Sequence, residues 1–458
     1  MSGKIGLVVV PVLLLGIAVS SEARVDSLTG GLDIGFDMDR YTYKGTQLSG
    51  SNRDYNRIFT SPSLRFKSDD LKDGIDFSYA PSFRYDLDGR GTDVDQALIF
   101  LANKSLLKEW RIRISEAYVN ADDSTLTSNQ GASAGNTTGN VSNPINDQIS
   151  NELGRHRFWN NTASLTSDYT YLQDSLVLVG YTYSMLRNDS GASLGYQDYD
   201  KHSGLASVSY RFLPAWKAII GGQYVRGFYD ARQITTAGTQ SDLSEYHGNM
   251  TLESYIFEKN VLSLSYGYIG TRYDDQTRND SDIHNAVLGW KRDLSPHLNF
   301  DLGGGPSFVK TEGQDGKLGY NAHANLNYAI EHGKMSIGAA KTYSQDNFSG
   351  TSTGGTIDSW TVIGNFNYQL SKNLSTGLVA SYADQDHQNA LVGIGGTTFY
   401  HEKISSTGVN IRYSFWRWYT LTLGYTFTRQ EADSMLVSSF DENRVYLSLG
   451  AQKELFRW

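Results

Sequence analysis

The chain alternates apolar and polar residues at every second position, run after run, from residue 28 to its end. The segment TASLTSDYTYLQDSLVLVGYTYSM (162–185) shows the pattern twice, with Leu165 and Tyr169 before a short turn and Val177 and Val179 after it. Successive side chains of a β-strand point to opposite faces, so each run predicts a strand with one apolar and one polar face. No amphipathic helical stretch of comparable quality occurs.

The connections between these runs alternate in length. Nine are short, for example Leu172–Asp174, Leu213–Ala215 and Glu331–Gly333, and ten longer ones lie between and around them. The longest is a polar stretch at about 121–154, rich in Asn, Ser, Thr and Gly. Short turns at one end and long loops at the other predict an all-β protein: a transmembrane, antiparallel, up-and-down β-barrel of about 20 strands (range about 16–22), with periplasmic turns and extracellular loops.

The aromatic content agrees with this fold. The chain holds 30 Tyr, 19 Phe and 8 Trp although charged residues make up 19% of it, and a membrane barrel turns its apolar face outward. Within hydrocarbon every backbone N–H and C=O must be paired inside the protein, which β-structure achieves by closing into a barrel. A soluble sandwich or propeller would alternate too, but would not explain the alternating connections. One barrel domain is therefore predicted over 24–458.

The first 23 residues, MSGKIGLVVVPVLLLGIAVSSEA, form a different segment. Lys4 precedes an apolar run, and Ser21 and Ala23 place small residues at the −3 and −1 positions of a cleavage site. A secretory signal peptide is predicted over 1–23, because the run is too short for a transmembrane helix. The chain has no Cys, a net charge of −9 and no basic patch, which argues against thiolate chemistry and nucleic-acid partners.

The polar parity of the strands is expected to line the barrel interior. It carries amides, hydroxyls and scattered charges of both signs, in place of the dense one-sign ladder of a strongly ion-selective pore. A barrel of about 20 strands is too wide for side chains to fill, so these residues should face water. The predicted lumen-lining residues are Glu245, His247, Asn249, Glu253, Asn321, His323, Asn325, Asn365, Asn367 and Arg412.

Aromatic residues on the apolar parity gather beside the predicted periplasmic turns, as an interfacial girdle would. They are Tyr169, Tyr171, Trp216, Trp290, Tyr368, Tyr413, Phe415, Trp416 and Tyr419. Glu116 and Lys341 break the parity, so each is expected near the outer headgroups or at a bulge, since a charge at the bilayer midplane costs about 2–4 kcal/mol. Pro62, Pro81 and Pro306 lie inside strand patterns, where each removes a ladder donor.

One acidic segment has carboxylates at spacings that could wrap Ca²⁺, namely Asp86, Asp88, Asp93 and Asp95. An acidic extracellular loop explains the same residues.

The nine His are scattered without a ligand pair, and no Gly-x-Ser-x-Gly elbow or phosphate loop occurs. The sequence thus predicts a protein that is not an enzyme, with no cofactor other than this calcium candidate.

The signal peptide, the ladder of hairpins and the final strand NRVYLSLGAQKELFRW (443–458) resemble Gram-negative outer-membrane porin-like barrels. Phe456 and Trp458 resemble the terminal signal read by the barrel-assembly machinery, although Gln452, Lys453 and Glu454 interrupt the alternation before it. The block RFWNNTASLTSDYTYLQDSLVLVGYTYSMLRNDS, followed by YQDYDKHSGLASVSYRF, is similar to β-barrel porins associated with exopolysaccharide systems.

This resemblance implies a channel in the outer membrane of a Gram-negative bacterium, passing small polar solutes or an exported polysaccharide. The implied partners are outer-membrane lipid, lipopolysaccharide and the assembly machinery. Two alternatives stay open. One is a structural sheath holding a periplasmic cytochrome or export complex, and the other is an outer-membrane hydrolase.

Overall fold

The computed structural model describes residues 25–44, 53–69, 73–89, 91–121, 156–189, 196–230, 241–255, 259–275, 278–350, 355–389, 399–433 and 439–457. The predicted signal peptide, almost all of the loop at 121–154 and Trp458 lie outside these residues. Within the described part of the chain, no helix is long and apolar enough to cross a membrane.

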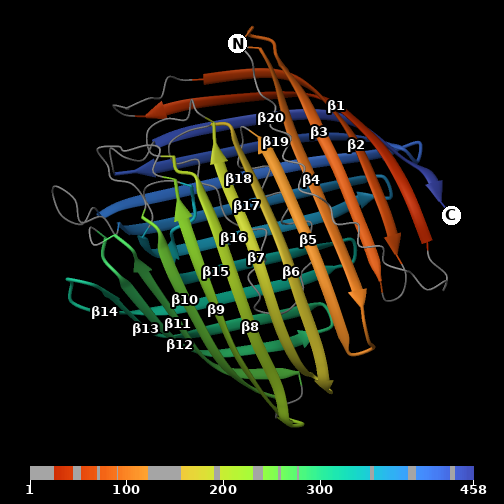
Figure 1. Cartoon of the computed structure of the whole chain (residues 1–458). Helices are drawn as coiled ribbons and strands as arrows, with labels where there is room; N and C mark the ends of the chain where they lie inside the picture. The colour runs from red at the N-terminus through yellow and green to blue at the C-terminus, as the bar shows by residue number, and fades with distance from the viewer. Residues whose placement is uncertain are drawn as a thin grey trace.

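Twenty antiparallel strands follow one another around a barrel, each paired with its neighbours in the sequence. The sheet closes because β20 runs beside β1, from Ser27↔Arg457 to Lys44↔Ser439 (Figure 1). The predicted fold class and strand number are therefore confirmed. The strands are β1 (Val25–Lys44), β2 (Arg53–Asp69), β3 (Gly74–Asp86), β4 (Thr92–Ser105), β5 (Trp110–Ala121), β6 (Phe158–Leu172), β7 (Ser175–Asn188), β8 (Tyr199–Leu213), β9 (Trp216–Tyr229), β10 (Leu243–Ser254), β11 (Asn260–Tyr273), β12 (Ser281–Ser295), β13 (Leu298–Thr311), β14 (Lys317–Ile330), β15 (Gly333–Asp346), β16 (Gly355–Ser371), β17 (Leu374–Asn389), β18 (Phe399–Phe415), β19 (Tyr419–Ala432) and β20 (Ser439–Arg457).

The connections alternate as the sequence predicts. Those after even-numbered strands span two to five residues, and those after odd-numbered strands span five to 36. The tight turns use left-handed backbone at Asp174 (φ 58°), Trp416 (φ 48°) and Arg417 (φ 62°). Hairpin loops of this kind need positive φ to follow the right-handed twist of the strands.

The apolar parity of the strands faces outward. Leu165 is 49% exposed, Val179 47% and Tyr181 48%, whereas Thr162 and Ser184 on the opposite parity are buried and hydrogen-bonded at 3.0 Å. A water-soluble barrel would hide these apolar side chains and expose the hydroxyls. The outer surface is therefore built to contact lipid.

Aromatic residues at the short-turn end are exposed on this surface. Trp416 is 79% exposed, and Phe415 stacks on Tyr419 at 5.6 Å between ring centroids.

At the long-loop end the structure adds a feature that the sequence analysis missed: two matching clusters of Tyr, His, Asp and Arg. They occur on two hairpins with the β9–β10 hairpin between them. They consist of Tyr181, Tyr183, His202, Asp200 and Arg187 in β7–β8, and Tyr266, Tyr268, His284, Asp282 and Arg272 in β11–β12.

The two clusters share their geometry. The hydroxyl of Tyr183 donates to Asp200 at 2.6 Å, and that of Tyr268 donates to Asp282 at 2.7 Å. We expect Tyr183→Phe and Tyr268→Phe each to lower the free energy of unfolding by about 1.5–3 kcal/mol, the usual contribution of a hydrogen bond to a charged group. Urea titration of the folded barrel measures this, and Tyr169→Phe is the matched control. A large loss of unfolding free energy in Tyr169→Phe, with none in Tyr183→Phe and Tyr268→Phe, would contradict a stabilising role for these hydrogen bonds.

The prolines interrupt the strand ladders. Pro62 and Pro81 lie in a break of the β2–β3 ladder between Thr60↔Phe83 and Leu64↔Tyr79. The hydroxyl of Ser61 bonds to that of Ser82 at 2.8 Å within this break. Pro306 lies at a similar break between β12 and β13. Each proline thus costs ladder bonds, but the strands continue across it.

The β12–β13 break brings two backbones close together at Gly305. A Cβ added there would lie 2.0 Å from the carbonyl oxygen of Ala286. We expect Gly305→Ala to destabilise the barrel by about 1–3 kcal/mol, because the backbone must shift to relieve the clash. The temperature at which the folded barrel unfolds on a gel measures this. Gly204→Ala is the control, since no atom lies within 4 Å of the added Cβ, and equal losses at both positions would refute the prediction.

The two residues that break parity have different settings, and a bulge occurs elsewhere. Glu116 lies on the outer face in an uninterrupted ladder, where Asn161 donates to it at 3.4 Å. Of the two expected alternatives, the bulge does not occur at Glu116, and a position at headgroup level remains a prediction. Lys341 pairs with Asp358 where the β14–β15 ladder stops. A bulge at Leu455 shifts the β1–β20 register, so Phe456 pairs with Leu28 and is 63% exposed.

Candidate functional site

The loop after β15 folds into the mouth of the barrel. We call its described part, Asn347–Gly350, the strap. It contacts the lumen-facing side of β7–β11, although it leaves the wall at β15. Between three and seven strands lie between β15 and the strands that the strap contacts, so the strap crosses part of the barrel mouth.

Asn347 fastens the strap by three hydrogen bonds to three strands. Its carbonyl oxygen accepts from the Tyr229 hydroxyl at 2.5 Å, and its Oδ1 accepts from the Tyr273 hydroxyl at 2.7 Å. Its Nδ2 donates to Oε1 of Glu245 at 2.7 Å. Because Asn347 is 2% exposed, losing any of these bonds would leave a buried polar group unpaired, at a cost of about 1–3 kcal/mol.

Phe348 fastens the strap by packing. Its ring meets Tyr199 edge-on at 5.5 Å and stacks on Tyr229 at 6.0 Å. The Nζ of Lys201 lies 4.8 Å above the same ring, within the range of a cation–π contact. These rings extend a buried cluster of Phe158, Leu186 and Tyr199. The strap therefore has an apolar anchor as well as a polar one.

Two glycines permit this docking. A Cβ at Gly227 would lie 2.7 Å from the Phe348 ring, so the wall is flat where the ring rests. Gly350 has φ +80°, in the left-handed region that favours glycine, and its carbonyl oxygen accepts from the Gln197 amide at 2.8 Å. No alternating pattern marks this segment, so sequence reasoning did not identify it.

Charged groups surround the strap. Glu245, which holds Asn347, also lies 3.1 Å from Nε2 of His247. The Arg278 guanidinium stands 5.3 Å from the centre of the Tyr273 ring, and burial lowers the pKa of this arginine from its usual value. His387 and Glu402 form a further buried pair at 3.3 Å. The described part of the mouth therefore carries charges of both signs.

The predicted lumen residues lie on the parity opposite the exposed apolar side chains, but they do not form one cluster. Glu245 alone among them contacts the strap. The others make local contacts: Glu253 accepts from Tyr255, His323 lies 3.2 Å from Asp301, and Asn321 accepts from the Tyr343 amide. His247, Asn249, Asn325, Asn365, Asn367 and Arg412 are distributed over β10, β14, β16 and β18. Their role in permeation remains a prediction.

The calcium candidate has competing cations. Asp95 forms an ion pair with Arg84 at 2.9 Å and lies 3.3 Å from Arg157, which also lies 3.4 Å from Asp93. Asp86 accepts the Asp88 amide, and Asn56 donates to Asp88. Among the residues that the structure describes, no group of three or more His, Cys, Asp or Glu side chains is placed to hold a metal ion. Calcium binding at these four residues stays a prediction.

The described strands define a class: a closed 20-stranded antiparallel barrel with an apolar exterior, a polar interior and an inward-folded strap, the form of a porin-like barrel of the outer-membrane type. No family model matches the sequence, and no curated protein matches it.

Solved structures of similar form come from Pseudomonas aeruginosa. The siderophore receptor PirA has a TM-score of 0.50 at 10% identity, covering 93% of this chain and 80% of the receptor. The ferric enterobactin receptor PfeA, as an R480A mutant with enterobactin, has a TM-score of 0.50 at 9% identity, covering 93% and 81%. OccK2 (OpdF), in complex with glucuronate, has a TM-score of 0.43 at 12% identity, covering 94% and 98%. At these identities the likeness concerns the fold.

Proposed function

We propose that this chain is an outer-membrane channel for small polar solutes, with the strap limiting the size of what passes. The observation that carries the proposal is the strap itself, docked by Asn347 and Phe348 on the lumen face of a barrel with an apolar exterior. The scattered charges and amides of the lumen wall favour polar solutes, which can exchange their hydrating water for hydrogen bonds to the wall. They do not favour ions of one sign.

The size limit favours small solutes over an exported polysaccharide. A polymer chain would need the strap to leave its site, and undocking it breaks the three hydrogen bonds of Asn347 and the ring contacts of Phe348. Polysaccharide export is therefore the secondary version of the proposal, and requires a strap that moves.

Purified barrel in planar bilayers tests the proposal. We expect steady single-channel steps and uptake of small neutral sugars into proteoliposomes, with uptake falling as solute size rises. Closed barrels would refute the channel. A pore that appears once a co-purifying protein is removed would favour the sheath alternative, and lipid hydrolysis by closed barrels would favour the hydrolase.

The location follows from the same proposal. We propose that residues 1–23 direct export and are removed, and that Phe456 and Trp458 contribute to recognition by the assembly machinery of a Gram-negative outer membrane. The outward side chain of Phe456, paired beside Leu28, supports this. Mass spectrometry of the mature protein tests the cleavage, and an intact N-terminus would contradict it.

A further inference from the structure

The barrel wall has a seam between β14 and β15. Their ladder runs from Ile330↔Gly333 to Ala322↔Lys341 and stops there. Beyond this point, Lys317–Asn321 of β14 stays paired with β13, and Thr342–Asp346 of β15 stays paired with β16. Over these outer ends, β14 is therefore paired with β13 but not with β15, and β15 is paired with β16 but not with β14.

The seam exists because the outer end of β15 turns into the lumen. Tyr343 packs there against Ile283 of β12 and Val309 of β13, and Nε2 of Gln345 donates to the Ser281 hydroxyl of β12 at 2.8 Å. The strap continues this inward course. The amide of Tyr343 has a side-chain partner, Oδ1 of Asn321 at 3.3 Å, in place of a ladder bond.

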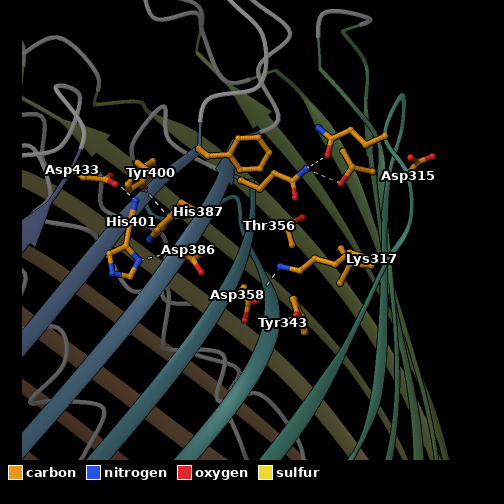
Figure 2. Close-up of a pocket in the computed structure, with 15 residues that line it drawn as sticks. Asp315, Lys317, Tyr343, Thr356, Asp358, Asp386, His387, Tyr400, His401 and Asp433 are labelled. Atoms are coloured by element: carbon orange, nitrogen blue, oxygen red, sulfur yellow. Dashed lines mark hydrogen bonds and ion pairs between the residues drawn. The ribbon is translucent and has the colours of Figure 1, made fainter.

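A pocket of about 500 Å³ lies at this seam. Figure 2 shows Asp315 and Lys317 on one side, Asp386, His387, Tyr400 and His401 on the other, and Tyr343, Thr356 and Asp358 between them. The Nζ of Lys317 lies 3.5 Å from Asp358 across it. Gln388 donates to Gln314 at 2.5 Å and so links β17 to the β13–β14 loop. We call this opening the window.

The outer rim of the window is apolar. Leu318 is 75% exposed and Phe399 67%, among the most exposed apolar side chains of the described residues. Below them, Tyr320 of β14 meets Trp360 of β16 edge-on at 6.2 Å, which joins the two sides of the seam on the outer surface. The window is thus polar inside and apolar at its membrane-facing edge.

We propose that the window is a binding site for an amphiphile of the outer leaflet, with its polar head in the pocket and its apolar chain against Leu318 and Phe399. An unpaired strand edge does not occur in contact with hydrocarbon, because each unpaired backbone group costs several kcal/mol. The edge at Lys317–Asn321 therefore needs polar partners, and a lipid head supplies them. The volume falls within the ordinary range of ligand pockets, about 300–1,000 Å³.

The pocket lining fits such a head. Lys317 is a cation for a phosphate group, while Asp358, Asp386 and Thr356 accept hydrogen bonds from ammonium or hydroxyl groups. A solute without an apolar part would leave Leu318 and Phe399 uncovered. The proposal does not require that the lumen conduct, so it stands independently of the proposed channel.

Photo-crosslinking tests the window. The chain has an aromatic residue at position 343, so p-benzoylphenylalanine is placed there. Gln223 is the lumen-facing control, because it is paired with both neighbouring strands, and Leu318 is the lipid-facing control. The folded variants are reconstituted in phosphatidylethanolamine–phosphatidylglycerol vesicles, irradiated and digested. We expect the mass of a lipid on the peptides carrying positions 318 and 343, and none on the peptide carrying position 223.

Two results would overturn the proposal. Lipid at position 318 alone would mean that the wall is sealed, and a protein adduct at 343 would mean that a second copy of the chain covers the seam. A second variant guards against a perturbed Tyr343 cluster. Lys317→Ala with the crosslinker at Tyr400, which also lines the pocket, should lose the phosphatidylglycerol adduct and keep the phosphatidylethanolamine adduct at a reduced level. Unchanged adducts in that variant would also refute binding of the head in the pocket.

Discussion

Phe348→Ala is expected to raise the single-channel conductance of the barrel and to replace steady steps with rapid fluctuation between levels. The ring is the apolar anchor of the strap, touching Tyr199 and Tyr229 beneath the cation of Lys201. Removing an aromatic ring of this kind costs about 3 kcal/mol. This loss mainly destabilises the docked state of the strap. Since about 1.4 kcal/mol corresponds to a factor of ten, the docking equilibrium shifts more than a hundredfold toward the undocked state.

The measurement is single-channel recording beside size-dependent sugar uptake, and both should change together. Phe212→Ala is the matched control, because Phe212 is exposed on the outer face at the short-turn end of β8 and touches neither strap nor lumen. Asn347→Ala should give the same phenotype through loss of the polar anchor. An unchanged conductance in both strap variants would show that the strap does not limit permeation.

The second large effect is expected at the lumen wall of β2–β4. Arg84 and Asp95 form an ion pair at 2.9 Å, with 7% and 4% of their side chains exposed. Arg84→Met should lower the free energy of unfolding by about 3–5 kcal/mol, because it leaves Asp95 buried with one cation fewer. Equilibrium unfolding in urea, followed by intrinsic fluorescence, measures the loss.

The adjoining pair of strands, β2 and β3, provides the control. Arg65 donates to Asp76 at 2.8 Å, but 52% of its side chain is exposed, so Arg65→Met should cost about 1 kcal/mol or less. The double variant Arg84→Met/Asp95→Leu should recover most of the stability, because the pair as a whole is replaceable by apolar side chains. Equal losses in the two single variants would refute the role assigned to burial.

The segment 162–185 shows how much of the fold is predictable. Its period of two, its turn at Leu172–Asp174 and the outward face of Leu165, Val179 and Tyr181 all follow from side-chain geometry along a strand. Strand number and closure follow as well, since each short turn or long loop leaves a local mark. The ladder breaks at Pro62 and Pro306 were expected for the same local reason.

The strap and the window, by contrast, could not be predicted from local sequence patterns. Asn347 meets Glu245, Tyr229 and Tyr273, and Tyr343 meets Ile283 and Val309, through contacts between residues far apart in the chain. No period or spacing encodes such a meeting. The predicted lumen residues share the polar parity, but that parity does not indicate which of them a loop will contact. Glu245 differs from Asn365 in its hydrogen bond to the strap.

By itself the sequence determined an outward-facing apolar barrel of twenty strands, because alternation and loop length are properties of neighbouring residues and the membrane requires every strand edge to be paired. The tertiary structure determined where two neighbouring strands are not paired, which is at the outer ends of β14 and β15. The end of β15 leaves β14, since Tyr343, Gln345 and the strap gain buried contacts inside the barrel. Those contacts arise when the barrel closes and brings distant strands to face one another.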